Sequence, residues 1–450
     1  MQKTLFLLGL CLGAIACDSS SWEETTPVIN RYERKWVKTF GGSEEDIAHD
    51  IIATADGGFA LLGNSQSTDG NLLGKTRTGS DIILMKFTAA RSLDWVQTYG
   101  GSEDERGHSL VQLPDNGYLL LGYAMSADGD LNNNEGQHDN WVLRVDDQGE
   151  LLWQKSYGFA GHDHAYHIMA TQDGGFLFNG FLDVTSSQGQ GATDKQNPNP
   201  ARHGVGEFWV HKLDANGELQ WRKYFGGTNN DRSYAAVEVD GGNFVLVGTS
   251  ESTDVDIRNP RGGYDIWAIK IDQNGTLLWE QSFGGRETDG ANAVALTPDQ
   301  KLLILGNTVS LDQDISSPLG NSDFWLLTLD LDGNLVTERS YGGSDFDLGR
   351  DLLVNRDQNV WLTGYSRSND IDLTTNRGDN DVALFYLDRK QFPLQQFSLG
   401  GSKQDLAHAL VEFGQGGVLV AGSSESADGD FLHNRGDKDI FIAYWDLISQ

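Results

Sequence analysis

Short apolar runs, separated by glycine-rich turns or polar loops, fill most of this chain. In one stretch, SLVQL (109–113) precedes a Pro-Asp-Asn-Gly turn, and YLLLGYA (118–124) follows as a continuous apolar run suited to burial on both faces. After a long polar loop, NWVLRV (140–145) and ELLWQKSY (150–157) are joined by a tight Asp-Asp-Gln-Gly turn. Helical periodicity is not convincing anywhere. The pattern therefore predicts an antiparallel unit of four strands.

This four-strand pattern recurs seven times between residues 35 and 450. A turn glycine after an aromatic residue marks each copy, at Gly41, Gly100, Gly158, Gly226, Gly284, Gly342 and Gly400. Repeated four-stranded units of this kind are typical of β-propellers. We therefore predict an all-β fold, a seven-bladed β-propeller with four antiparallel strands per blade. The predicted blades cover residues 43–99, 102–157, 160–225, 228–283, 286–341, 344–399 and 402–450.

The two ends of the repeat region predict how the ring closes. WVKTF (36–40) matches a fourth strand, whereas IFIAYW (440–445) matches a third strand. We expect residues 35–40 to complete the last blade, because an unclosed ring would leave two sheet faces exposed to water. The region 35–450 is then a single domain.

The N-terminus has the features of a targeting segment. Lys3 precedes an apolar run of 13 residues (4–16), which is too short to span a bilayer as a helix. The run ends Ala14-Ile15-Ala16-Cys17, which resembles a bacterial lipobox, where the cysteine is lipidated. We expect a lipoprotein signal peptide at 1–16, then the acylated Cys17 and a flexible tether over 17–34. An ordinary secretory signal with an incidental cysteine is the alternative.

Charge and cysteine content narrow the function classes. The formal net charge is -32, which argues against a nucleic-acid partner because phosphate binding needs clustered Lys and Arg. Cys11 lies within the predicted signal, so a mature chain would keep one cysteine and no internal disulfide. The charge suits a soluble protein outside the cytoplasm, a cation site or a basic partner, and the cysteine content leaves no thiol nucleophile in the mature chain.

Two motifs indicate a family resemblance. KLDANGELQW (212–221) resembles the Trp-docking repeat of PQQ-type bacterial propellers. The wider pattern, W-x3-[FY]-G-G, then DGGF, then S-x-D-G-D, resembles repeats in uncharacterised surface lipoproteins of the Bacteroidota type. The resemblance implies the propeller fold and a lipid-anchored location. It does not imply a quinoprotein activity, because the adjacent cysteine pair and the other cofactor motifs of those enzymes are missing from the sequence.

Acidic residues recur at fixed positions in the predicted loops. Five residues after each turn glycine stands an acid, here termed the framework acid: Asp46, Glu105, Asp163, Asp231, Asp289, Asp347 and Asp405. A Ser-x-Asp-x-Asp motif supplies candidate calcium ligands, because Ca²⁺ prefers several oxygen ligands, at Asp128, Asp130, Asp254, Asp256, Asp312, Asp314, Asp370, Asp372, Asp428 and Asp430. The alternative is that these acids cap turn amides.

Blade three departs most from the repeat. It holds an insertion in the loop between Gly180 and Trp209, and its first loop is rich in histidine. Candidate contacts to a partner or ligand are Phe159, His162, His164, His167 and His203. A transition metal held by two or three of these imidazoles with Asp163, a glycan or protein contact, and neutral drift all remain open.

One further position varies among the copies. Three residues after the framework acid stand His49, His108, Tyr166, Tyr234, Asn292, Arg350 and His408. These side chains are expected either to ring the mouth of a central channel or to hydrogen-bond into the next blade.

The leading hypothesis is a non-catalytic, lipid-anchored binding or scaffold propeller at the outer membrane, facing the periplasm or the cell surface. Its partner would be a protein of an outer-membrane assembly. A surface glycan-binding protein, with calcium as the possible cofactor, is the alternative. A hydrolase or lyase with its site at blade three is the third hypothesis, although the sequence shows no catalytic motif.

Overall fold

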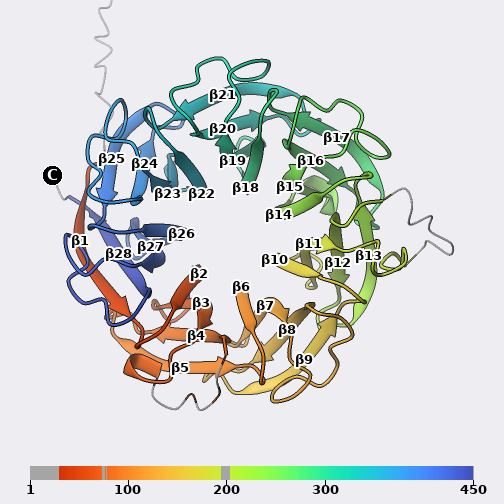
Figure 1. Ribbon diagram of the computed structural model, residues 1–450, viewed down its shortest axis with the longest axis horizontal. Helices are drawn as coiled ribbons and strands as arrows, with labels where there is room; N and C mark the ends of the chain where they lie inside the picture. The colour runs from red at the N-terminus through yellow and green to blue at the C-terminus, as the bar shows by residue number, and fades with distance from the viewer. Residues whose placement is uncertain (1–29, 73–74, 76, 78, 194–202, 449–450) are drawn as a thin grey trace, which may run out of the picture. The chain divides into compact units, whose positions relative to one another are not determined.

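The computed structural model describes residues 30–72, 75, 77, 79–193 and 203–448. Arg31–Gln450 forms one compact unit, in which seven four-stranded antiparallel sheets stand around a common centre (Figure 1). The strands that begin at residues 46, 105, 164, 231, 289, 347 and 405 lie innermost, one in each sheet. The structure confirms the predicted seven-bladed β-propeller. The predicted signal peptide, Cys17 and most of the tether lie outside the described residues.

The blades follow one another along the chain. Blade one holds β2 (Asp46–Ala53), β3 (Phe59–Ser65), β4 (Asp81–Phe87) and β5 (Leu93–Tyr99). Blade two holds β6 (Glu105–Gln112), β7 (Tyr118–Ala124), β8 (Asp139–Val145) and β9 (Leu151–Tyr157). Blade three holds β10 (His164–Ala170), β11 (Phe176–Leu182), β12 (Glu207–Leu213) and β13 (Leu219–Phe225). Blade four holds β14 (Asp231–Glu238), β15 (Phe244–Ser250), β16 (Asp265–Ile271) and β17 (Leu277–Phe283).

The remaining blades repeat this order. Blade five holds β18 (Asp289–Leu296), β19 (Leu302–Thr308), β20 (Asp323–Leu329) and β21 (Leu335–Tyr341). Blade six holds β22 (Asp347–Val354), β23 (Val360–Ser366), β24 (Asp381–Leu387) and β25 (Pro393–Leu399). Blade seven holds β26 (Asp405–Phe413), β27 (Gly417–Ser424), β28 (Asp439–Leu447) and β1 (Tyr32–Phe40). Among the residues that the structure describes, the short 3-10 turns η1 (Gly70–Leu72) and η3 (Asp240–Gly242) lie in connections.

The N-terminal strand closes the ring as predicted. β1 pairs antiparallel with β28, from Tyr32 opposite Leu447 to Phe40 opposite Ile440. It begins at Tyr32, before the predicted start at residue 35. An ion pair of 2.8 Å between Arg34 and Asp430 adds to this closure.

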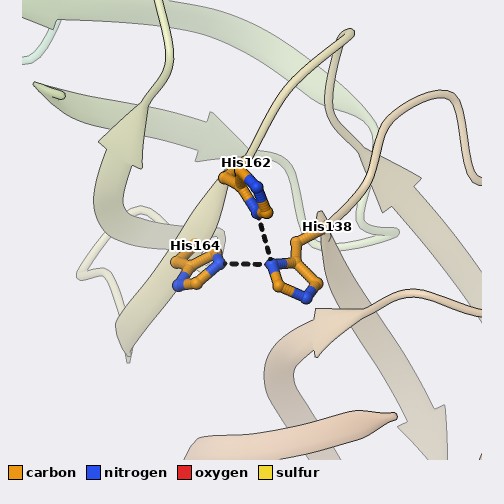
Figure 2. Close-up of side chains that lie close together, drawn as sticks. All are labelled: His138, His162 and His164. Atoms are coloured by element: carbon orange, nitrogen blue, oxygen red, sulfur yellow. Dashed lines mark hydrogen bonds between the residues drawn. The ribbon is translucent and has the colours of Figure 1, made fainter. Parts of the chain in front are cut away.

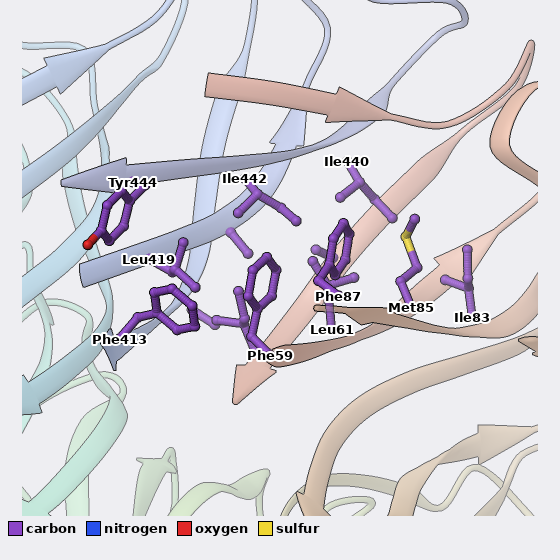
Figure 3. Packing of buried hydrophobic residues seen from close by; sticks show 14 of the residues in the cluster. Phe59, Leu61, Ile83, Met85, Phe87, Phe413, Leu419, Ile440, Ile442 and Tyr444 are labelled. Atoms are coloured by element: carbon purple, nitrogen blue, oxygen red, sulfur yellow. The ribbon is translucent and has the colours of Figure 1, made fainter. Parts of the chain in front are cut away.

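Apolar side chains fill the spaces between neighbouring blades. Figure 3 shows the cluster between blades seven and one, where Phe59 and Phe87 stack with ring centroids 4.5 Å apart. Leu419 and Ile442 approach them from blade seven. The second strands are almost wholly buried, as in β3 and β7. The blades therefore share their cores, and each sheet is stabilised by both neighbours.

Each innermost strand carries a β-bulge at the variable position. The register shifts in blade one between Ala48 and Asp50, so that His49 is left out of the pairing, and the other six blades do the same. The bulged residues line a central cavity of about 160 Å³ together with their neighbours. The rings of His49 and His108 lie 4.8 Å apart. Asn292 also donates a 2.7 Å hydrogen bond to the Gly349 carbonyl in the next blade, so both expected roles occur.

Candidate functional site

The antiparallel order of each blade places two sets of loops on one face. The loops from the second to the third strand and the loops from the fourth strand to the next blade both emerge there, and we call this the long-loop face. At each blade junction, the residue before a third strand lies beside the loop that opens the next blade. His138, for example, forms a parallel bridge with His162, and Gly206 does so with Asn230.

The framework acids hold the loops of this face in place. In blade one, the buried Asp46 carboxylate accepts hydrogen bonds of 2.8 Å from the Gly42 N–H and the Ser67 hydroxyl. Asp231 makes the same two contacts in blade four. Burial raises the pKa of Asp231 to about 6, and the hydrogen bonds from Ser250 and Gly227 oppose that shift. These acids therefore act in the architecture of the loops.

The Ser-x-Asp-x-Asp acids also bind backbone amides. In blade two, Asp128 accepts a 2.8 Å hydrogen bond from the Ser102 N–H, and Asp130 accepts one of 3.0 Å from the Gly100 N–H. The second acid is also paired with an arginine of the preceding blade at three junctions: Arg77 with Asp130, Arg261 with Asp314, and Arg377 with Asp430. The hydrogen bonds from backbone N–H groups are those expected of acids that cap turns. Calcium binding by these residues stays a prediction.

Three histidines meet at the junction of blades two and three (Figure 2). The Nδ1 atom of His138 lies 2.8 Å from Nδ1 of His162 and 2.8 Å from Nε2 of His164. Their candidate ligand atoms all fall within 4.8 Å of one another, and no other such group of three occurs among the described residues. His162 is exposed, whereas His138 and His164 are half-buried. The cluster therefore opens onto the long-loop face.

The backbone and an aromatic wall hold these rings. The Asp163 N–H donates a 2.8 Å hydrogen bond to the His138 carbonyl, and the Gln137 N–H donates one of 2.9 Å to the Gly161 carbonyl. The Tyr123 ring stacks on His164 with centroids 4.0 Å apart and also lies 5.1 Å from His138. The rings of His138 and His164 are thus positioned by contacts outside the cluster, and the backbone bridge to His138 places His162 beside them.

The environment keeps two of the imidazoles neutral. Burial, followed by the neighbouring histidines and arginines, lowers the pKa of His164 to about 3. Burial, followed by His162 and Arg106, lowers the pKa of His138 to about 4. At neutral pH both rings are uncharged, so each has a lone pair available for a hydrogen-bond donor or a metal ion.

The other predicted residues of blade three lie apart from this cluster. Asp163 accepts hydrogen bonds from the Phe159 and Asp183 N–H groups, and burial raises its pKa to about 8. His167 follows the bulge in β10 and lines the central cavity. His203, in the insertion, lies 3.1 Å from the buried Glu207 carboxylate. Insertion residues 194–202 lie outside the described residues.

Phe159 belongs to a different feature of the same junction. The guanidinium of Arg222 lies 4.4 Å from its ring centroid. Both line a polar pocket of about 670 Å³, whose other residues include Asn132, Asn133, Asn134 and Glu135. Neither His138 nor this run of asparagines is among the site residues predicted from the sequence.

No helix among the residues described is both long and apolar enough to cross a membrane.

Comparisons with known proteins give the following similarities. No family model matches the chain. The regulatory protein FlaEY of Caulobacter vibrioides is 27% identical over 201 residues, which make up 41% of this chain and only 20% of that protein. The Pan2 WD40 domain of Neurospora crassa is 10% identical with a TM-score of 0.49, covering 92% of this chain and 94% of that domain.

Two bacterial structures are also similar. BamB of Moraxella catarrhalis is 12% identical with a TM-score of 0.43, covering 92% of this chain and 99% of BamB. A protein of unknown function from Bacteroides caccae is 10% identical with a TM-score of 0.40, covering 75% and 93% of the two chains. Identities at this level assign no activity to the chain.

Proposed function

We propose that this propeller is a non-catalytic binding protein of the bacterial outer membrane, anchored through a lipidated Cys17, that holds a protein partner on its long-loop face. The observation that carries this proposal is a set of exposed apolar side chains on loops of blades four to seven, which we call the apolar arc. Its members, with their exposed fractions, are Val255 (38%), Leu311 (67%), Phe346 (42%), Ile371 (56%) and Leu432 (69%). They stand singly, one to a loop, and Met125 (37%) and Val205 (55%) are exposed on the same face in blades two and three. The partner that we infer therefore spans several blades.

The backbone conformation of two members supports the proposal that the apolar arc contacts a partner. Val255 and Ile371 both have φ of 57°. The same loop position is glycine in three other blades, with φ of 64° at Gly70, 69° at Gly129 and 62° at Gly429. β-branched residues are strained in this left-handed region. An exposed side chain that costs stability and fills no core is best explained by a contact made outside the chain.

Charge indicates the chemistry of the partner. The chain carries a formal net charge of -32, and acids flank the arc, as Asp370 and Asp372 flank Ile371. A protein surface with an apolar centre and basic edges would complement both features. Catalysis is not part of this proposal.

The test uses the full lipoprotein solubilised in detergent from its native membrane. Native mass spectrometry of the wild type should show a stoichiometric complex with one membrane or surface protein. Leu311→Ser and Leu432→Ser should weaken that complex at least tenfold, because each removes a large exposed apolar contact. Leu278→Ser is the matched control, since Leu278 is 51% exposed on β17 and lies outside the arc. A lone wild-type monomer, or equal loss in the control, would contradict the proposal.

The anchor is tested separately. Cells labelled with radioactive palmitate should incorporate label into the wild-type chain, and Cys17→Ser should abolish it and release the protein from membranes. Label retained in Cys17→Ser would remove the lipid anchor from the proposal without affecting the apolar arc.

A second candidate function is glycan binding in the pocket beside Phe159. Three consecutive asparagines, Glu135, Arg222 and an aromatic ring line it, which together offer hydrogen-bond donors, acceptors and a stacking face. A glycan array should then show a ligand whose binding is lost in Asn133→Ala and kept in Asn216→Ala, an exposed turn control. No ligand on the array, or loss in both variants, would exclude this function.

A further inference from the structure

We propose that His138, His162 and His164 form a binding site for a divalent transition metal, with Zn²⁺ as the first choice, that joins blade two to blade three. A ring nitrogen of His162 and a ring nitrogen of His164 both point toward Nδ1 of His138 (Figure 2). Imidazole is a preferred ligand of Zn²⁺, Cu²⁺ and Ni²⁺, and three imidazoles with one open position are an established donor set for zinc. This site goes beyond the proposed partner-binding role, which rests on blades four to seven.

The close approach of the ring nitrogens favours a cation within the cluster. Nδ1 of His138 lies 2.8 Å from two other ring nitrogens at once. A ring nitrogen carries either one N–H or one lone pair, so it cannot form two well-directed hydrogen bonds there. A metal ion would accept a lone pair from each ring. Ligand nitrogens around tetrahedral zinc stand ~3.3 Å apart, given Zn–N bonds of about 2.0–2.1 Å. The two 2.8 Å pairs would therefore open by about half an ångström, and the remaining pair, which lies within 4.8 Å, would reach the same spacing.

The seven junctions of the ring show that the fold does not require histidine here. The position of His138 is occupied elsewhere by Ser80, Gly206, Tyr264, Ser322, Asn380 and Lys438. The position of His162 is occupied by Glu45, Asp104, Asn230, Thr288, Phe346 and Gln404. The position of His164 is occupied by Ile47, Arg106, Arg232, Gly290, Leu348 and Leu406. Three different framework positions thus hold the same metal-ligating residue type only where blades two and three meet.

The frame around the cluster orients part of the donor set before any ion arrives. The His138 carbonyl and the Asp163 N–H are hydrogen-bonded across the junction, and Tyr123 stacks on His164. Phe181 covers another side of the His164 ring at 4.9 Å. A rigid set of ligands loses little freedom on binding, which favours affinity.

Charged groups near the cluster limit its affinity for a metal ion. Arg106 and Arg232 place positive charge near His164, and Asp104 partly offsets this near His138. The Asp163 carboxylate is not part of the cluster, because it is held by the Phe159 and Asp183 N–H groups. We therefore expect three imidazoles and water as the ligands, instead of the combination with Asp163.

The experiment measures Zn²⁺ binding by the detergent-solubilised full lipoprotein, purified without a histidine tag. Isothermal titration with ZnCl₂ should show one ion per chain, and Co²⁺ should give the visible absorption of tetrahedral coordination. Zn²⁺ should also raise the melting temperature, because it binds only the folded junction. Each of His138→Ser, His162→Asn and His164→Arg should weaken binding at least tenfold.

The variants and controls are chosen from the chain itself. Serine, asparagine and arginine occupy the same three positions at other junctions, so the variants should fold with nearly unchanged metal-free melting temperatures. His433→Ser alters an exposed histidine in the loop of blade seven and should leave Zn²⁺ binding intact. Unchanged affinity in the three variants, or equal loss in His433→Ser, would overturn the proposal.

A measurement on the wild type alone covers the case in which a variant misfolds. Diethyl pyrocarbonate should modify His162, and Zn²⁺ should protect it while leaving His433 reactive, as read by peptide mass spectrometry. Failure of Zn²⁺, Co²⁺, Ni²⁺ and Cu²⁺ to protect His162 would overturn the proposal in that case as well.

Discussion

The carboxylate of Asp50, in blade one, accepts a 2.9 Å hydrogen bond from the backbone N–H of Leu110 in blade two. Asp351 makes the same 2.9 Å contact with the Leu410 N–H, from blade six to blade seven. Both acids follow the bulged residue of an innermost strand, so the extra residue of the bulge leaves room for a side chain to reach the neighbouring sheet. Innermost strands of neighbouring blades are thus hydrogen-bonded through a side chain at the junction of blades one and two and at the junction of blades six and seven.

Asp50→Asn should make the protein relatively more stable as pH rises. Burial raises the pKa of Asp50 to about 6, above its usual 3.8. The folded wild type holds this proton more tightly than the unfolded chain does. The resulting contribution to folding stability is fully present below pH 3.8 and is lost as pH rises through about 6. Asparagine keeps an acceptor for Leu110 without the charge. Between pH 4 and pH 8, the stability of the variant relative to wild type should rise by about 1–2 kcal/mol in urea titrations. An equal rise in Asp94→Asn, an exposed acid on β5, would count against this explanation.

Tyr32→Ala should weaken the closure of the ring. The Tyr32 ring is buried and meets Trp361 and Tyr386 edge-on, with centroids 4.7 and 4.8 Å away. Truncation of a buried aromatic costs about 3–5 kcal/mol, which chemical unfolding will measure. Lys35→Ala, which alters an exposed residue of β1, should change stability by less than about 0.5 kcal/mol. Deletion of residues 32–40 should abolish cooperative unfolding, and a truncated chain that melts like wild type would refute closure by β1.

Calcium should leave the melting temperature unchanged. The Ser-x-Asp-x-Asp acids already accept backbone N–H groups, and three of them also pair with arginine, so their negative charge is partly balanced. The measurement compares thermal unfolding in EGTA with unfolding in excess Ca²⁺, at matched ionic strength. A clear upward shift with Ca²⁺, lost in Asp254→Asn, would instead support a calcium site in the repeated loops.

Ile371→Gly should stabilise the chain while weakening partner binding. Glycine adopts the left-handed conformation freely, so the substitution removes about 1 kcal/mol of backbone strain. The reverse change, Gly129→Val, should destabilise blade two, because a Cβ there would lie 2.4 Å from the Gly100 carbonyl oxygen. Thermal unfolding measures both. A loss of stability in Ile371→Gly would mean that the side chain supports the fold, and that the apolar arc does not include it.

The fold could be predicted from the sequence because each blade repeats the same local signals. The turn glycines and the apolar second strands mark all seven copies, and the match of WVKTF to a fourth strand predicted the closure. The exact start of β1 could not be predicted. Tyr32 lies outside the recognisable motif, and its place in the strand comes from packing against Trp361 in blade six.

The histidine cluster could be predicted only in part. His162 and His164 stood out because they depart from the repeat, but His138 lies in another blade, beside the ordinary strand-opening acid Asp139. Contact between the two segments depends on how a loop of one blade meets the next, which chain spacing does not show. Aligning the residue before each third strand with the first loop of the following blade would have paired His138 with His162, because these positions are bridged at several junctions.

The seven bulges have a consequence for how such a protein can evolve. A residue outside the pairing register can be exchanged without altering the ladder of its strand, since its neighbours keep their partners. The cavity wall now holds three histidines, two tyrosines, an asparagine and an arginine at equivalent positions. Each blade therefore offers one position at which a single substitution changes the side chain that lines the cavity. Duplicated blades can diverge at these positions while their strand pairing stays the same.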